Sequence, residues 1–249
     1  MSANLLGKAL YAVGLTIWVV LSFAIGQSLA VLLLTSLPLD LNDSVLTTIA
    51  AALSYVLGLT LALGVPALAS KKFISKKTLG IDRLPSWSNI GLGFLAVLPY
   101  YIVSGLLVWL GLEVFKVINP EVGQQIGFEN LTLRVEYLVA FITLVIMAPL
   151  AEELLFRGYF LGRLTERNGK WLALLVTSVV FGLMHLVGAS ESGIVLQWGA
   201  AADTFAMGLV AGALRLLSGS IWAGVVLHSV KNAIAFYFLF INPLPPGGM

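Results

Sequence analysis

The sequence predicts an all-α protein, a polytopic bundle of seven to eight transmembrane helices with a polar cavity inside the membrane. Three observations support this prediction. Of the 249 residues, 59% are hydrophobic and only 10% are charged, whereas a soluble domain is roughly half apolar and about a quarter charged. The mean hydropathy is +0.99, and apolar segments of about 20 residues, the length that crosses a bilayer, recur along the chain. A few ionisable residues nevertheless interrupt these segments. We expect one integral membrane domain over residues 1–249.

Seven segments are apolar and long enough to be considered as spans. The expected spans are residues 9–34, 45–69, 90–111, 137–161, 171–187, 194–215 and 220–241. An eighth span within 112–136 stays open. The first apolar run is too long for the core of a signal peptide, so we expect a retained helix. Asp40 and Asn42 mark the first connection, and Gly80 and Pro85 mark the second.

The distribution of basic residues predicts the orientation. Lys and Arg near span ends favour the cytoplasmic side. The seven-span arrangement places most of the 14 basic residues on one side, with the N-terminus cytoplasmic, and we expect a bacterial plasma membrane. The loop at 70–83 carries Lys71, Lys72, Lys76, Lys77 and Arg83. It acts as a topology signal, or alternatively contacts anionic lipid.

The lack of cysteine excludes several functions, whereas the net charge excludes none. The net charge of +2 is small, and we expect membrane lipids but no nucleic acid as partners. The chain has no cysteine, so disulfides, cysteine metal sites and a thiol nucleophile are all excluded.

Charged side chains at membrane depth are costly, at about 2.5–3.5 kcal/mol each on insertion scales, and they usually mark function. The ionisable and amide side chains within the predicted spans are Glu152, Glu153, Arg157, His185, Asp203, His228, Lys231 and Asn232. Both histidines of the protein belong to this set. Their spacing along each helix predicts which of them share a face.

Helical spacing predicts how the first group of charges is arranged. Glu153 and Arg157 are four residues apart, so they lie on one helix face and can pair with each other. Glu152 is rotated from Glu153 by about 100° and can face neighbouring helices instead. His228 and Asn232 are also four apart and face the same way.

Together these groups predict the attack of an activated water molecule on a carbonyl. A carboxylate such as Glu152 in a dry pocket can act as a general base, with His185 beside it. His228 and Asn232 supply donors suited to an oxyanion. Alternatively, Glu152, His185 and His228 resemble a zinc ligand set with water as the fourth ligand. The residues leave both mechanisms open, and a peptide bond is the natural carbonyl for a membrane hydrolase.

Two other classes of protein could use the same residues. A proton-coupled transporter also needs buried Glu, His and Arg, but such proteins often show internal repeats, and we find none. A non-catalytic immunity or scaffold protein could retain the cluster for helix packing. The signatures of other intramembrane proteases, HExxH, GxSG and GxGD, do not occur in the sequence.

Three motifs resemble those of a known family over roughly residues 135–241. The motifs are Glu152-Glu153-Leu-Leu-Phe-Arg157, Phe181-Gly-Leu-Met-His185 and His228-Ser-Val-Lys-Asn232. In this order they are similar to the EExxxR, FxxxH and HxxxN motifs of the type II CAAX prenyl endopeptidases and their bacterial relatives. These relatives are also called glutamate intramembrane proteases, or the CAAX protease and bacteriocin-processing family.

The resemblance implies an intramembrane endopeptidase with three roles for its residues. These are activation of water by Glu152 and His185, oxyanion binding by His228 and Asn232, and support of Glu152 by Glu153 and Arg157. It implies a peptide or protein substrate, lipidated in CAAX processing, and bacterial members include bacteriocin immunity proteins. The family is described both as metalloproteases and as metal-independent, so no cofactor is certain and a divalent metal such as zinc is left open.

One geometric difficulty follows from the predicted spans. Counted along them, Glu152 lies about 8 Å from the inner face of the membrane and His185 about 21 Å from it. The two side chains could not meet at these depths. If the cluster forms, one of the predicted spans must differ, and we expect the fifth span to enter the membrane near Leu175.

Overall fold

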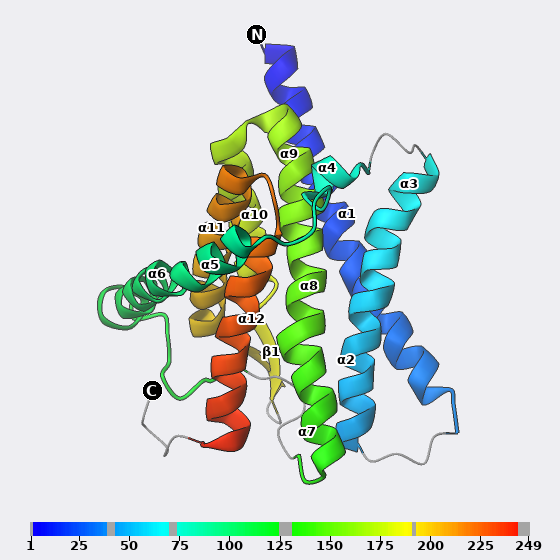
Figure 1. Ribbon diagram of the computed structural model, residues 1–249, viewed down its shortest axis with the longest axis vertical. Helices are drawn as coiled ribbons and strands as arrows, with labels where there is room; N and C mark the ends of the chain where they lie inside the picture. Colours follow the sequence, from blue (N-terminus) through cyan, green and yellow to red (C-terminus); the bar gives the residue numbers. More distant parts are fainter. Residues whose placement is uncertain (1, 39–42, 70–73, 125–130, 191–192, 244–249) are drawn as a thin grey trace.

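The protein is a helical membrane bundle, shown as a computed structural model in Figure 1. The structure describes residues 2–38, 43–69, 74–124, 131–190 and 193–243. The predicted helix breakers Asp40 and Asn42 and the basic residues Lys71 and Lys72 lie outside these ranges. The predicted all-α class is confirmed, with a single short β-hairpin among the described elements.

The N-terminal quarter forms a long helical hairpin. It consists of α1 (Ser2–Thr35), α2 (Asp43–Leu59), the π-helical turn η1 (Thr60–Gly64) and α3 (Val65–Ala69). Glycines allow the two arms to approach closely, because a Cβ added at Gly26 would lie 2.5 Å from the backbone nitrogen of Gly58. The indole nitrogen of Trp18 donates a hydrogen bond to the carbonyl of Ala62 at 3.1 Å. The hairpin therefore has one fixed register.

The next segment crosses from one side of the bundle to the other. It consists of α4 (Lys76–Leu79), α5 (Trp87–Leu95), α6 (Val97–Trp109) and η3 (Leu110–Val114). The short helix α4 ends at Gly80, whose φ of 70° favours glycine. The helix α5 begins with a capping box, in which Ser86 and Asn89 satisfy each other's backbone amides. A Cβ at Gly93 would meet Val226, so α5 packs closely on α12.

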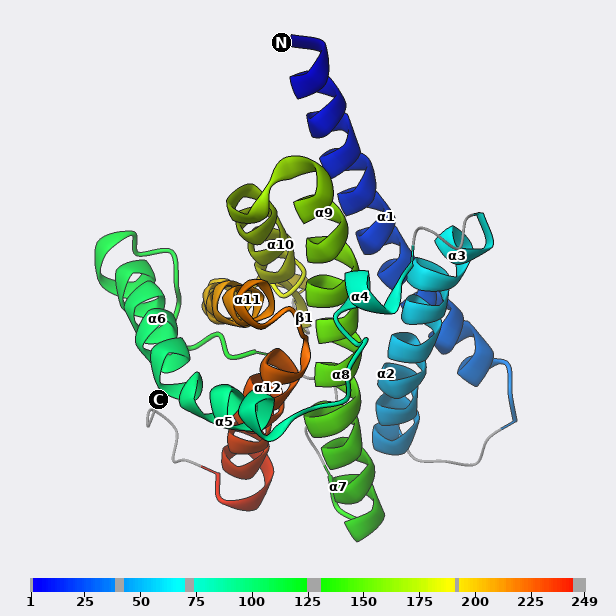
Figure 2. The ribbon, with the colours of Figure 1, turned by 45° about the horizontal axis from the view of Figure 1, so that its top comes forward.

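The centre of the bundle is one continuous helix of 35 residues from Arg134 to Asn168. Its parts are α7 (Arg134–Phe141), η4 (Ile142–Met147), α8 (Ala148–Glu152), η5 (Glu153–Phe160) and α9 (Leu161–Asn168). Figures 1 and 2 show it between the α1–α3 hairpin on one side and α10–α12 on the other. Its two π-helical stretches widen the turns, a feature frequent at functional sites.

The C-terminal third departs from the predicted spans. It consists of α10 (Lys170–Leu183), β1 (Val187–Ser190), β2 (Gly193–Leu196), α11 (Trp198–Ser218), α12 (Trp222–Phe236) and η6 (Tyr237–Ile241). The span expected at 171–187 is a helix of 14 residues, about 21 Å long and too short for a core of about 30 Å. The span expected at 194–215 starts only at Trp198. Gly188 and Gly193 lie in the hairpin that replaces the missing turns, and Gly193 has a φ of 118°.

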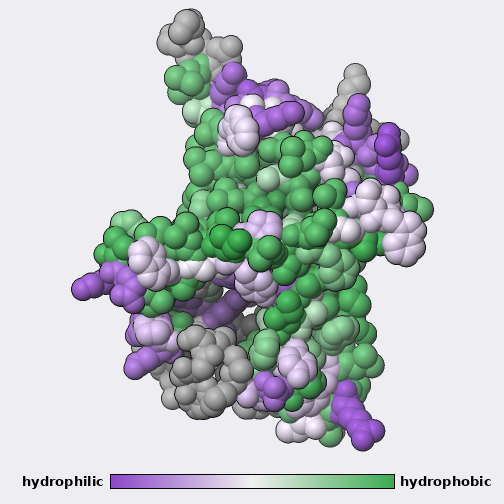
Figure 3. Space-filling view, turned by 60° about the vertical axis from the view of Figure 1, so that its left-hand side comes forward, coloured by the Kyte–Doolittle hydropathy of each residue, from purple (hydrophilic) through white to green (hydrophobic). Residues whose placement is uncertain are grey.

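Among the residues that the structure describes, six helices are long and apolar enough to cross a membrane, and α10 is a shorter apolar helix. The predicted count of seven to eight spans is therefore not confirmed. Within the described part of 112–136, no helix lies between Val114 and Arg134. Figure 3 shows a broad hydrophobic surface with hydrophilic residues towards its upper and lower ends, as expected for an integral membrane protein. The lower half of this face is also hollowed, with hydrophilic residues inside the hollow.

Small residues hold α10 and α11 together. A Cβ added at Gly208 would lie 2.8 Å from both the Cα and the Cβ of Ser178, and one at Gly182 would lie 2.8 Å from the carbonyl oxygen of Ala201. Such close backbone approach is typical of membrane helix pairs, which lack a hydrophobic driving force of their own. The position of His185, just beyond α10, depends on this contact.

We therefore expect Gly208→Val to destabilise the folded protein by about 1–3 kcal/mol, because the added side chain overpacks the contact with Ser178. Thermal unfolding in detergent micelles measures the effect. Gly105→Val on α6 is the matched control, since nothing lies within 4 Å of its Cβ position. Equal midpoints for the two variants would contradict this account of the α10–α11 contact.

Candidate functional site

The predicted site residues of α8, η5 and α10 lie at one level in the bundle. The central helix runs on to Asn168 rather than ending at 161. Glu152 is 16 residues before that end, or about 24 Å along the helix, and His185 is 15 residues after Lys170, or about 22 Å. The fifth helix, α10, begins at Lys170, and the membrane entry expected near Leu175 stays a prediction. The longer fourth helix by itself removes the difference in depth.

The candidate site contains a buried ion pair. Arg157 Nη1 lies 3.1 Å from Glu153 Oε1, as the spacing of four residues predicted, and both side chains are almost completely buried. Glu153 also contacts α12, because the Nδ1 atom of His228 lies 3.2 Å from the same Oε1 atom. A Cβ at Gly224 would lie 2.7 Å from Glu153 Oε2, so only glycine lets α12 approach the carboxylate here. Glu153 thus links η5 to α12.

Aromatic rings surround the guanidinium group of Arg157. Its Cζ atom lies 4.3 Å from the centre of the Phe181 ring and 6.0 Å from that of Phe156. Cation–π contacts of this kind gain strength when the cation is desolvated. Glu152 also lies near enough to act electrostatically on Arg157. The cation is therefore compensated by two carboxylates and by the face of a ring.

Glu152 receives a hydrogen bond that the sequence did not predict. Tyr55 of α2 donates its hydroxyl to Glu152 Oε1 at 2.9 Å, and Phe23 of α1 packs edge-on against Tyr55 with ring centres 5.7 Å apart. The other carboxylate oxygen, Oε2, lies 3.8 Å from Nε2 of His228. No motif marks Tyr55, which is one aromatic residue in a long apolar span, so no sequence signal could have identified it.

His185 lies at the end of α10, half-buried and facing the same region. Its Nδ1 atom lies 2.9 Å from the carbonyl oxygen of Phe181. Because a carbonyl only accepts, Nδ1 carries the proton and Nε2 of the neutral ring is an acceptor. The ring of Phe181 lies 5.0 Å from His185 and 6.2 Å from His228, centre to centre. Glu152, His228 and Lys231 all act electrostatically on His185, so the two halves of the site are close.

Asn232 uses one of its N–H groups in a contact between helices. Its Nδ2 atom donates a hydrogen bond to the carbonyl of Leu144 at 2.8 Å. Leu144 lies in η4, and π-helical turns change which backbone groups pair within the helix. An amide nitrogen has two donors, so one N–H group of Asn232 is still available for a ligand.

A second polar cluster connects α6, α11 and α12. Lys231 Nζ lies 3.2 Å from Asp203 Oδ2. Tyr100 and Ser104 of α6 both donate hydroxyl hydrogen bonds to Asp203 Oδ1. Both Asp203 and Lys231 were noted in the sequence, and the structure explains them as an ion pair that is anchored by two hydroxyls. The pair lies beside the first cluster, since Lys231 precedes Asn232.

The predicted zinc ligands do not form a metal-binding group. Across the ranges that the structure describes, no three His, Asp or Glu side chains converge as a metal site requires. Glu152 and His228 approach no closer than 3.8 Å, and Nδ1 of both histidines is engaged elsewhere. The zinc alternative therefore stays a prediction.

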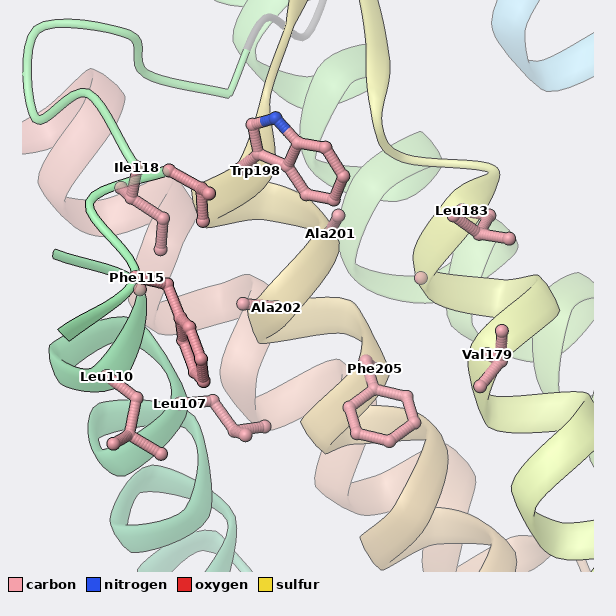
Figure 4. Close-up of a pocket in the computed structure, with 13 residues that line it drawn as sticks. Leu107, Leu110, Phe115, Ile118, Val179, Leu183, Trp198, Ala201, Ala202 and Phe205 are labelled. Carbon is pink, nitrogen blue, oxygen red and sulfur yellow. The ribbon is translucent and has the colours of Figure 1, made fainter.

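An apolar cavity of about 340 Å³ lies next to the site. It is enclosed by α6 and the chain after it, by the end of α10 and by the start of α11 (Figure 4). Gly182 and Leu183, which precede His185, and Ala202, which precedes Asp203, belong to its lining. The labelled side chains in Figure 4 are all apolar or aromatic, so the cavity suits a hydrophobic group.

The fold and the buried charges together define a class, an integral membrane helix bundle with a buried Glu, His and Arg cluster. Residues 134–234 match the family described as Type II CAAX prenyl endopeptidase Rce1-like. The family resemblance predicted from the three motifs is confirmed over these residues. A protein of Escherichia coli described as an uncharacterized 24.3 kDa protein is 31% identical over 105 residues, 41% of this chain and 45% of that protein. The alignment thus spans less than half of that relative. No solved structure matches the chain.

Removal of the Glu153 charge tests whether this carboxylate stabilises the buried charge of Arg157. We expect Glu153→Gln to destabilise the fold by about 3–5 kcal/mol, because the variant leaves the Arg157 charge buried without its partner. The matched control is Glu166→Gln, which breaks the exposed ion pair with Arg163 and should cost at most about 1 kcal/mol. Thermal unfolding midpoints in micelles compare the two. A similar small loss in both variants would show that Glu153 does not stabilise Arg157.

Proposed function

We propose that the protein is an intramembrane endopeptidase that hydrolyses a peptide bond with water activated by Glu152. The main support for this proposal is the position of the carboxylate. Tyr55 donates a hydrogen bond to Oε1, while Oε2 lies 3.8 Å from Nε2 of His228. A carboxylate fixed through one oxygen presents the other to a reactant in a defined direction, which is what a general base requires. The family match over residues 134–234 supports a peptide substrate.

In this mechanism, water bound between Glu152 Oε2 and Nε2 of His185 attacks the carbonyl carbon of the substrate. The proton of the water passes to Glu152, and a new C–O bond forms. Glu152 then delivers the proton to the peptide nitrogen as the C–N bond breaks, which leaves a carboxyl terminus and a free amine. No step requires a group beyond these side chains and water.

His228 and Asn232 stabilise the oxyanion in this proposal. Carboxylate oxygens face both ring nitrogens of His228, with Glu153 Oε1 3.2 Å from Nδ1 and Glu152 Oε2 3.8 Å from Nε2, so both nitrogens act as donors in this proposal. In that form Nδ1 donates to Glu153 and Nε2 donates to the developing oxyanion, helped by the second N–H of Asn232. Glu153 and Arg157 support catalysis through His228 and the fold, rather than by direct contact with Glu152.

The substrate is a membrane-bound peptide or protein in this proposal, and C-terminal processing of a lipidated chain is its most specific form. The apolar cavity beside His185 supports this view, because it offers about 340 Å³ for a hydrophobic part of the substrate. The basic ends of α4, α9 and α10 support a cytoplasmic N-terminus in a bacterial plasma membrane.

Replacement of Glu152 tests the proposal. Purified protein in liposomes should cleave members of a library of quenched fluorescent peptides, made with and without a farnesyl group at the C-terminus. We expect Glu152→Gln to reduce cleavage at least about 1,000-fold at unchanged thermal stability, because the base is lost. Glu166→Gln is the control with the same change of charge, and should cleave normally. Cleavage by Glu152→Gln at the normal rate would contradict the role of Glu152 as the base, and no cleavage by the unaltered protein would favour a non-catalytic immunity or scaffold role.

Tyr55 should act as a positioning residue for Glu152. Tyr55→Phe removes the hydroxyl that holds Oε1, and we expect kcat to fall about tenfold with little change in KM, because the base is less well oriented. Tyr137→Phe is the matched control, since the hydroxyl of Tyr137 binds the backbone carbonyl of Leu131. Equal kinetics for the two variants would remove Tyr55 from the mechanism.

A further inference from the structure

The β-hairpin of β1 and β2 begins directly beside the candidate site. His185 is the second residue before β1, and the backbone nitrogen of Gln197, just after β2, donates to the carbonyl of Leu186 at 2.7 Å. Figure 1 shows β1 between α12 and α8, the helix that ends at Glu152, and Figure 2 shows it between α11 and α8. A strand in this position can contact the same ligand as the catalytic groups.

The register shows which backbone groups point away from the hairpin. In an antiparallel pair, residues alternate between those that bond across the ladder and those whose N–H and C=O face outwards. Leu186 bonds with Gln197, so Gly188 and Val195 form the next bonding pair. Val187, opposite Leu196, and Ala189, opposite Ile194, therefore direct their backbone groups outwards.

These outward groups lie at membrane depth. The helix α10 covers about 21 Å from Lys170, so β1 begins within a hydrocarbon core of about 30 Å. Irregular or unpaired backbone is tolerated at that depth only where it is buried in protein or lines a water-filled cavity. The Val187 side chain is 62% exposed and its cross-strand partner Leu196 is 50% exposed. Within the described ranges, no further strand pairs with the outer edge of β1. The outer edge of β1 is therefore suited to line the water-filled cavity that supplies the water for hydrolysis.

We propose that the outer edge of β1 binds the substrate as an additional antiparallel or parallel strand and leads its scissile bond past His185 to Glu152. This inference rests on the proposed function and names how that site holds its substrate. An extended peptide supplies the N–H and C=O groups that complement Val187 and Ala189, and β-strand addition to an exposed edge is a common mode of peptide recognition.

The positions of the two strands indicate that the substrate pairs with β1 rather than with β2. The edge of β1 continues from His185, whereas β2 leads into α11, whose first turns line the apolar cavity. Only a peptide paired with β1 runs alongside the catalytic residues. Val187 and Leu196 are cross-strand partners with equivalent outward-facing backbone, so they form a matched pair for substitution.

Proline at Val187 or at Leu196 removes one outward N–H group and leaves the cross-strand hydrogen bonds intact. Edge strands tolerate such a substitution. The probe is fluorescently labelled β-casein, an unfolded chain. We expect Val187→Pro to raise KM for casein about fivefold at unchanged kcat, as loss of one backbone hydrogen bond predicts. Leu196→Pro should retain the original KM.

Binding without turnover separates this inference from the proposed function. In the Glu152→Gln background, casein should bind and should slow hydrogen exchange at the amides of Val187 and Ala189, and Val187→Pro should weaken that binding about fivefold. Binding with this pattern but no cleavage by the active chain would contradict the hydrolase and support the strand site. Normal cleavage by Val187→Pro, equal losses in both proline variants, or absence of casein binding would overturn the strand site.

Discussion

The compensation of one buried guanidinium group governs how this bundle is built. Arg157 lies almost fully inside a membrane protein, where an unpaired cation would be prohibitively costly. Glu153 pairs with it along the helix, Phe181 covers it from α10, and His228 contacts Glu153 from α12. Each of these contacts requires one helix to take a defined position against the central one. The charge cluster thus orients three helices as well as the site between them.

The N-terminal hairpin also belongs to the site, although the family match begins only at residue 134. Tyr55 reaches Glu152 from α2, and α1 supports Tyr55 through Phe23. A carboxylate that accepts a hydrogen bond from a buried hydroxyl is held in one orientation and is partly compensated for its loss of water. The first two helices therefore contribute a side chain to the candidate site, and do more than enclose it.

Irregular backbone is concentrated around the same residues. The stretch from Glu153 to Phe160 is π-helical, α10 stops after 14 residues, and the hairpin continues the chain beyond His185. A membrane protein can depart from regular helices only where other protein groups or water satisfy the backbone. Tyr100, Ser104, Asp203 and Lys231 provide a second satisfied polar network beside the first cluster. The interior of the bundle therefore holds two polar clusters side by side.

The sequence by itself determined the membrane class, the family resemblance of residues 134–234 and the pairing of Glu153 with Arg157. Composition and apolar segment length follow directly from the need to match a bilayer, and a spacing of four residues acts within one helix. Only the tertiary structure decided that the central helix extends to Asn168, which brings Glu152 level with His185, and that Tyr55 and Leu144 bind Glu152 and Asn232. It also decided that strands replace the last turns of the fifth span. These features arise between segments far apart in the chain, where helix packing and the compensation of buried charge outweigh local preference.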